Sequence, residues 1–328
     1  FAVVRYNVGM KNIPDIHDVR HILICRPEGC LGREIASSCC YREIKKASPQ
    51  TKITVACYAA AYDFCQHNPY VDEVFKLPLG AGLRPNRRWG ALLWAALKLR
   101  RKNFDLLLDT SGNDFLNWRL FKRMAAGDRV LDSRSSPVQP FGAPQASAAE
   151  HEAAVLRLLG VAEPDKSYDL PVLPTARAAV AQILEREQIQ KYILLYPGNS
   201  LPKNAFRPDV LKELCAALRS LKVSFVLPLA PSCTEKYHDI FKDSKDVFVV
   251  KPADIFELFE WVRRAALVVA PDTPVVHIAA GFEKPSLVFY AVSPAHMPDN
   301  PKAQALETDK TDVNVFDWWK LESIVAGF

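Results

Sequence analysis

The chain has 328 residues, of which 49% are hydrophobic and 24% are charged. This composition excludes a disordered protein, and the length is sufficient for two domains of ordinary size. No apolar stretch approaches the roughly 20 residues that a membrane-spanning helix needs. Residues 1–172 contain 24 Lys and Arg against 18 Asp and Glu, whereas the remainder contains 18 against 19. The basic excess of the first half predicts an anionic partner there.

The eight cysteines include no Cys-x-x-Cys pair, and six of them lie in or beside apolar runs. We therefore expect buried thiols in a reducing cytoplasm, and neither a disulfide framework nor a zinc site. The first twelve residues lack the flanks of a signal peptide. Because they also lack an initial Met, we expect a trimmed chain.

Short apolar runs alternate with helical patterns from residue 21 onward. The predicted strands are 22–25, 52–57, 71–77, 104–109 and 129–131, and the predicted helices are 34–46, 59–66, 89–101, 115–125 and 150–159. In the helix at 89–101, Leu92, Leu93, Ala96 and Leu99 have core spacing. Residues 133–147 are rich in Ser, Pro and Gly and predict a surface loop. This alternation is typical of a parallel sheet with helices on both faces.

Residues 164–174 contain three prolines and predict a linker. A second series follows, with predicted strands at 192–196, 225–229 and 247–250 and predicted helices at 176–188, 208–221, 234–241 and 255–265. We expect a terminal helix at 317–325 to pack across a domain boundary. The predicted architecture is α/β of the GT-B type: two Rossmann-like domains, 1–172 and 173–313, facing a central cleft, with 314–328 as the terminal segment.

The stretch 267–290 contains the strongest candidate site. A buried apolar strand ends in Asp-Thr-Pro, and Thr273 suits the N-cap of a following helix with Pro274 at its first position. The N–H groups of residues 275–277 then point out of a positive helix end, where a phosphate group can bind. The alternative is that Asp272 and Thr273 only cap the helix and that His277 packs on it.

Taken in order, several segments resemble glycosyltransferase family 9, the ADP-heptose:lipopolysaccharide heptosyltransferases. Tyr-Pro-Gly-Asn-Ser-Leu-Pro-Lys at 196–203 resembles the family's first nucleotide-domain loop, and Asp-Thr-Pro-Val-Val-His at 272–277 resembles its Asp-Thr-Gly-x-x-His signature. In the first half, 68–74 resembles the family's Asn-Pro-x-Val-Asp-Glu-Val segment, and 104–112 its Asp-x-x-x-Asp-x-x-Gly strand and turn. The resemblance covers most of residues 20–310.

The resemblance implies an inverting, metal-independent transfer of heptose from ADP-heptose to an acidic lipopolysaccharide core. The first domain would bind the acceptor and the second the nucleotide-sugar, without a cofactor. We expect a monomer in peripheral contact with the cytoplasmic face of the bacterial inner membrane. No nucleic-acid partner is expected, because no recognised binding module is present.

Site residues follow from the positions that match the family. The implied donor-binding residues are Asn199, Ser200, Lys203, Glu235, Asp272, Thr273, Pro274, Val275 and His277. Guanidinium groups bind carboxylate and phosphate groups with paired hydrogen bonds. The candidate acceptor-binding residues are therefore basic residues of the first half: Arg26, Arg33, Arg84, Arg87 and Arg88. A solvated basic face is the alternative for the last three, and a solvated surface Lys is the alternative for Lys203.

Two positions depart from the family pattern. Gly32-Arg33 stands where the family has a Gly-Asp whose carboxylate is its candidate base, so Glu34 and Glu28 become the candidate bases here. Glu34 has a simpler alternative role, as a first-turn carboxylate that complements a helix dipole. Pro274 replaces the Gly whose N–H would face the phosphates. Two further hypotheses follow: a GT-B glycosyltransferase with another nucleotide-sugar, or a nucleotide- or glycan-binding protein without catalysis.

Overall fold

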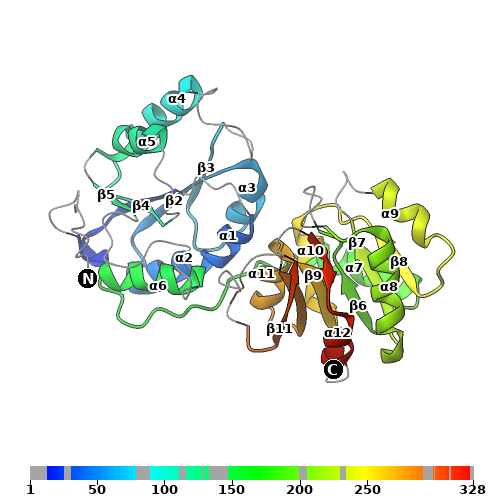
Figure 1. Ribbon diagram of the computed structural model, residues 1–328. Coiled ribbons are helices and arrows are strands. Elements are labelled where there is room, and N and C mark those ends of the chain that lie inside the picture. The colour runs from blue at the N-terminus through cyan, green and yellow to red at the C-terminus, as the bar shows by residue number, and fades with distance from the viewer. Residues whose placement is uncertain are drawn as a thin grey trace, which may run out of the picture. The chain divides into compact units, whose positions relative to one another are not determined.

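The structure is a computed structural model that divides into two compact units, Phe1–Asp169 and Leu170–Phe328. Each unit is an α/β layer structure built on its own sheet (Figure 1). The described residues are 13–25, 31–78, 89–110, 116–127, 129–132, 147–198, 205–229, 234–290, 298, 300–309 and 312–325.

The first unit contains five parallel strands in the order β3-β2-β1-β4-β5. The strands are β1 (His21–Cys25), β2 (Lys52–Cys57), β3 (Glu73–Lys76), β4 (Leu106–Asp109) and β5 (Val130–Asp132). All four residues of β4 are buried, as are nearly all of those in β1 and β2. Strands buried on both faces read as continuous apolar runs, which is why the sequence predicts them.

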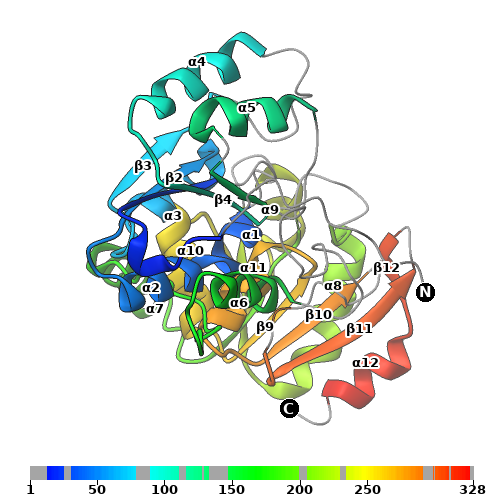
Figure 2. The ribbon, with the colours of Figure 1, turned by 90° about the vertical axis from the view of Figure 1, so that its left-hand side faces the viewer.

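Helices cover both faces of this sheet. They are α1 (Leu31–Ala36), α2 (Ser38–Ala47), α3 (Ala59–Gln66), α4 (Trp89–Arg100), α5 (Leu116–Ala126) and α6 (Ala148–Leu158), preceded by the short 3-10 helix η1 (Ile16–Asp18). The strand order reverses after β3, and right-handed crossovers then place α4 and α5 on the opposite face from α2 and α3. Figures 1 and 2 show α4 and α5 side by side on that face.

The predicted helix 34–46 is two helices, α1 and α2, separated at Ser37. The Ser37 hydroxyl donates to Oε1 of the buried Glu152 at 2.7 Å. This contact with α6 gives a buried carboxylate oxygen a hydrogen bond and accompanies the break. A single-helix pattern in the sequence does not reveal such a distant partner.

The second unit has seven strands in the order β12-β11-β10-β9-β6-β7-β8. The strands are β6 (Tyr192–Leu195), β7 (Ser224–Pro228), β8 (Val247–Val250), β9 (Leu267–Pro271), β10 (Ser286–Tyr290), β11 (Ala303–Asp309) and β12 (Asp312–Phe316). The helices are α7 (Pro174–Arg186), α8 (Pro208–Leu218), α9 (Thr234–Phe241), α10 (Ile255–Arg264), α11 (Pro274–Gly281) and α12 (Trp318–Val325), with the 3-10 turn η4 (Arg219–Leu221) after α8.

Strands β11 and β12 are absent from the sequence prediction. β11 runs parallel to β10, and β12 pairs with β11 in the antiparallel direction, so the sheet is not wholly parallel as expected. Leu306 and Thr308 are the only buried residues of β11. With so few buried positions β11 has no continuous apolar run, so its polar sequence does not show the pattern of a buried strand.

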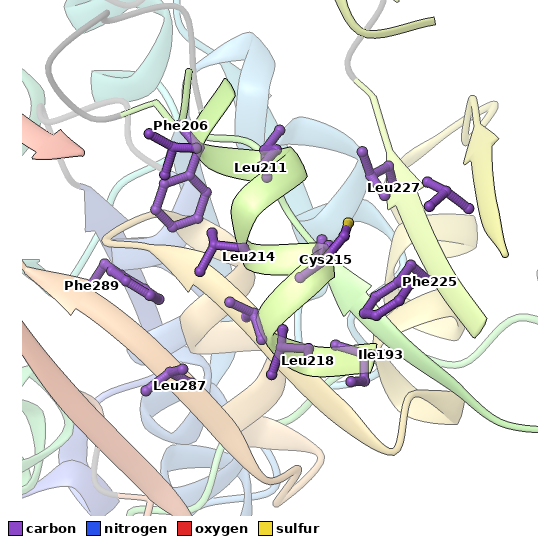
Figure 3. Packing of buried hydrophobic residues seen from close by; sticks show 14 of the residues in the cluster. Ile193, Phe206, Leu211, Leu214, Cys215, Leu218, Phe225, Leu227, Leu287 and Phe289 are labelled. Atoms are coloured by element: carbon purple, nitrogen blue, oxygen red, sulfur yellow. The ribbon is translucent and has the colours of Figure 1, made fainter. Parts of the chain in front are cut away.

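The core of the second unit lies between its sheet and α8. Leu211, Leu214 and Leu218 of α8 belong to one buried cluster with the strand residues Phe225 and Phe289, which lie on the two sides of this helix in Figure 3. Cys215 belongs to the same core, and its burial there raises the pKa of its thiol to about 12. Leu321 also joins this core, so α12 packs on the second unit. Its expected packing across a domain boundary stays a prediction.

The six cysteines within the described residues are buried, as predicted, and none of these six forms a disulfide there; Cys30 and Cys233 lie outside them. None of the helices that the structure describes is long and apolar enough to cross a membrane.

Candidate functional site

The strand order of the second unit creates a switch point between β6 and β9. β6 pairs with β7 on one side and with β9 on the other. Connections at such a point leave the sheet in opposite directions, and ligands of open α/β sheets bind outside the carboxyl ends of the strands there. The Tyr196 N–H donates to the Val269 carbonyl at 2.9 Å, and the Asp272 N–H donates to the Phe289 carbonyl at 3.1 Å. The predicted loops 196–203 and 272–277 therefore leave the same edge of the sheet.

Thr273 has the position expected of an N-cap but does not use its side chain as one. Its backbone is extended (φ −146°) and its side chain forms no capping hydrogen bond. The Thr273 residue is 4% exposed, and among the residues that the structure describes its Oγ1 has no hydrogen-bond partner. The predicted N-cap position of Thr273 is therefore confirmed, but its side chain does not form the capping hydrogen bond. A buried hydroxyl without a partner costs about 1–3 kcal/mol, and one in a native fold calls for an explanation.

The first turn of α11 is tighter than predicted. Pro274 occupies the start of the helix, as expected. The Val276 N–H donates to the Thr273 carbonyl at 3.0 Å, so the prediction that it points outward is wrong. This 3-10-type hydrogen bond pairs one of the N–H groups that have no partner inside the helix at its start. The N–H groups of Val275 and His277 stay candidates for a ligand.

Asp272 is exposed and His277 is partly buried on α11. Both follow β9 directly, at the carboxyl edge described above. Their implied role as donor-binding residues stays a prediction.

Residues 197–198 and 205–206, at the two ends of the loop after β6, pair with each other and form what we call the stem of this loop. Gly198 has φ +119°, a conformation that favours glycine, and it forms an antiparallel bridge with Ala205. The Phe206 N–H donates to the Pro197 carbonyl at 2.6 Å. The Phe206 ring is buried, 4.9 Å from the ring of Phe289. The predicted ligands Asn199, Ser200 and Lys203 belong to this loop but lie outside the described residues.

Asn314 of β12 holds the returning side of the stem. Its Oδ1 accepts from the Arg207 N–H at 2.7 Å, and its Nδ2 donates to the Ala205 carbonyl at 3.0 Å. Asp312 fixes the amide in turn by accepting from Nδ2 at 2.6 Å. Asn314 is 7% exposed. This positioning residue is not predictable from the sequence, because β12 lacks a clear strand pattern and a lone Asn carries no signal of such a contact.

Asn314→Ala is expected to lower the free energy of unfolding by about 1–3 kcal/mol, because it removes the partners of two backbone groups. It is also expected to weaken nucleotide binding, since the loop loses its anchor. Urea unfolding and calorimetric titration with ADP measure the two effects. Gln304→Ala, which removes an exposed amide from β11, is the matched control. Equal behaviour of the two variants would contradict the anchoring role.

The first unit has a corresponding switch point at β1, which lies between β2 and β4. Arg33 lies at this edge but is 6% exposed. Its Nη2 donates to the Thr110 carbonyl at 2.8 Å and lies 3.8 Å from Oε1 of Glu152. The same carboxylate oxygen accepts from the hydroxyls of Ser37 and Thr110, at 2.7 and 2.6 Å. Arg33 thus balances the charge of a fully buried carboxylate, and its predicted contact with the acceptor stays a prediction.

The candidate base Glu34 is also buried, at 4% exposure, and accepts a hydrogen bond from the Tyr41 hydroxyl. This geometry supplies it with a structural partner; its catalytic role stays a prediction. The rival base Glu28 and four of the candidate acceptor residues lie outside the described residues: Arg26, Arg84, Arg87 and Arg88. Glu235 belongs to α9, but its side chain is also outside the described part.

Solved structures of low sequence identity share the fold. The glycosyl transferase family 9 protein from Veillonella parvula DSM 2008 is 13% identical with a TM-score of 0.76, covering 98% of this chain and 100% of that one. E. coli ADP-heptose lps heptosyltransferase II is 17% identical with a TM-score of 0.67, over 93% and 98%. E. coli heptosyltransferase WaaC with ADP is 15% identical with a TM-score of 0.69, over 94% and 99%.

These similarities confirm the predicted α/β architecture of the GT-B type. No curated protein sequence matches the chain. The family model of glycosyltransferase family 9 (heptosyltransferase), however, matches residues 94–312. This match extends from α4 of the first unit to the start of β12 in the second and includes the loops at the β6–β9 edge. The chain therefore belongs to glycosyltransferase family 9, the heptosyltransferase family.

Proposed function

We propose that the protein transfers heptose, with inversion and without a metal ion, from ADP-heptose to the acidic core of a lipopolysaccharide. Family membership supports the glycosyl transfer, and the two E. coli relatives are named for ADP or ADP-heptose. The observation that carries the nucleotide site is the buried Thr273 hydroxyl at the start of α11. A diphosphate oxygen is the acceptor that this hydroxyl lacks within the described part of the chain.

Departure of a diphosphate requires stabilisation of its developing charge. A helix start contributes about 0.3–1 kcal/mol, and up to ~2 when partly buried. This is insufficient alone, so we assign the remaining stabilisation to the Thr273 hydroxyl, the Val275 N–H and Lys203. Asp272, which directly precedes Thr273 and is exposed, would accept hydrogen bonds from the sugar hydroxyls and hold the donor for attack.

The attacking hydroxyl needs a general base, and we retain Glu34 and Glu28 as its candidates. The acceptor is proposed to bind the first unit, whose basic excess suits a glycolipid that carries carboxylates or phosphates. Such an acceptor places the protein at the cytoplasmic face of the inner membrane.

A second candidate function is nucleotide or glycan binding without transfer. The observation that favours it is the engagement of Arg33 with Thr110 and Glu152. At the position where the family has its candidate catalytic carboxylate, this chain has a buried cation that already neutralises another residue.

A thermal-shift titration with ADP, UDP, GDP and CMP tests the donor. We expect selective stabilisation by ADP, of about 2.7 kcal/mol at 100 times its Kd. Lys203→Ala and Asp272→Ala should each reduce this stabilisation, whereas the exposed Lys191→Ala should not. A preference for UDP or GDP would be compatible with the fold but would contradict ADP-heptose as the donor. Stabilisation by ADP without transfer to any acidic glycolipid core would favour the non-catalytic function.

A further inference from the structure

An exposed apolar stripe lies along α4. Leu93, Trp94 and Leu97 are 40%, 52% and 49% exposed. Their i, i+1, i+4 spacing places them on one face of the helix, opposite the buried Leu92 and Leu99. The expectation that Leu93 belongs to the core is therefore wrong: the core needs only one face of α4. Exposed apolar side chains that gather in a patch mark an interaction site.

The neighbouring helix α5 continues this surface. α4 and α5 lie side by side in both views (Figures 1 and 2), and Arg100 Nη1 of α4 donates to the Met124 carbonyl of α5 at 3.2 Å. Leu120 of α5 is 39% exposed. On their inner sides both helices pack into the core of the first unit. Their outer sides form what we name the α4–α5 surface, with these exposed residues: Leu93, Trp94, Leu97, Lys98, Arg100, Arg101, Arg119, Leu120 and Arg123.

The charge on this surface has one sign. Its five charged residues are all Lys or Arg, and residues 89–104 and 115–127 contain no Asp or Glu. On the helix circumference, Arg100 and Lys98 flank the apolar stripe on its two sides. The Lys98 Nζ lies 3.9 Å from the centre of the Trp94 ring. The ammonium group of Lys98 and the indole of Trp94 are therefore in contact on the outer side of α4.

This combination fits a specific kind of partner. Apolar side chains flanked by cations match a surface that is anionic outside and apolar beneath, as a bilayer of acidic lipids is. Trp is the aromatic side chain that favours the headgroup level of a membrane. An acidic protein would account for the cations alone, whereas a bilayer also accounts for the exposed side chains of Trp94 and Leu97 between them.

We propose that the α4–α5 surface docks the protein on an anionic lipid bilayer through Trp94, its apolar neighbours and the flanking cations. The inference rests on the proposed function in one respect: a glycolipid acceptor gives membrane docking its purpose. The docking itself is a property of this surface and requires no nucleotide.

Co-sedimentation of the full chain with vesicles tests the proposal. We expect binding to vesicles of one part phosphatidylglycerol to three parts phosphatidylethanolamine, weak binding to pure phosphatidylcholine, and release in high salt. Lys98→Gln/Arg101→Gln should weaken binding roughly 25-fold, from about 1 kcal/mol per cation. Trp94→Ser/Leu97→Ser should also weaken it, without lowering the melting temperature, because both side chains are exposed.

Matched controls exist in the second unit. Lys191→Gln/Lys212→Gln removes two exposed cations, and Trp319→Ser removes a Trp that is 75% exposed; both should bind vesicles like the wild type. The proposal is overturned if the wild-type chain does not sediment with the anionic vesicles, or if the surface variants bind as well as the controls. It is also overturned if the apolar stripe proves to hold two copies of the chain together without lipid.

Nucleotide titration of the same variants separates this inference from the proposed function. Retained stabilisation by ADP together with lost vesicle binding supports the docking surface. Normal vesicle binding without any response to nucleotide leaves the docking surface in place and contradicts the proposed donor.

Discussion

Replacement of Thr273 by valine is expected to weaken ADP binding about tenfold or more while the free energy of unfolding stays equal or rises. A hydrogen bond to a charged group contributes about 1.5–3 kcal/mol, which corresponds to a factor of roughly 10–150 in affinity. Valine has nearly the shape of threonine, so the packing around position 273 is retained. Because Oγ1 has no partner within the described part of the fold, its removal relieves a desolvation cost in the free protein.

Calorimetric titration with ADP and urea unfolding of the free protein measure the two quantities. Thr273→Ser, which keeps the hydroxyl, is the control and should bind ADP close to the wild type. If valine leaves the ADP affinity unchanged, the buried hydroxyl has no part in the nucleotide site. If valine instead lowers the free energy of unfolding by more than 1 kcal/mol, the hydroxyl has a structural partner and the site argument fails.

Replacement of Arg33 by methionine is expected to lower the free energy of unfolding by about 3–5 kcal/mol, the usual cost of leaving a buried charge without its partner. Glu152 is fully buried, and Arg33 is the cation beside its carboxylate, at 3.8 Å. Arg33→Asp should be at least as damaging, because it adds a second carboxylate near Glu152. Restoring the family's acidic residue is therefore not expected to restore a catalytic base.

Urea unfolding measures this effect, and the double variant Arg33→Met/Glu152→Gln is its control. Removing both charges should recover most of the lost stability, since no ion then lies buried alone. The contrary result is informative: unchanged stability in Arg33→Met would leave Arg33 available for an anionic acceptor. A larger loss in the double variant would mean that Glu152 has another partner that matters more.

Much of the fold is readable from the sequence because parallel strands are buried on both faces. Runs such as Leu106–Asp109 and Leu267–Pro271 are nearly all apolar, and they appear as β4 and β9. The polar turns after such strands mark the carboxyl edges of the sheets, so the sequence also indicates where the site lies. Pro274 is at the helix start for a local reason, its missing N–H.

The contacts that position the site were not readable. Asn314 meets the loop after β6 only because β12 lies beside it, and Arg33 meets Glu152 only because α1 and α6 share a face of the first sheet. Their partners are far apart in the chain, and no periodicity records them. Thr273 illustrates the same limit within one turn: its sequence suits an N-cap, yet its hydroxyl is left unbonded by the described fold.

The sequence by itself therefore determined the α/β class, the order of the main strands along the chain and the two segments that follow β6 and β9 at one edge of the second sheet. These features depend on burial and backbone geometry, which repeat along the chain at short range. Only the tertiary structure decided which polar groups are satisfied, which helix face is exposed and where Arg33 points. Those outcomes depend on residues that are distant in the sequence and that folding brings together. A buried charge or hydroxyl is stable only where such residues pair with it.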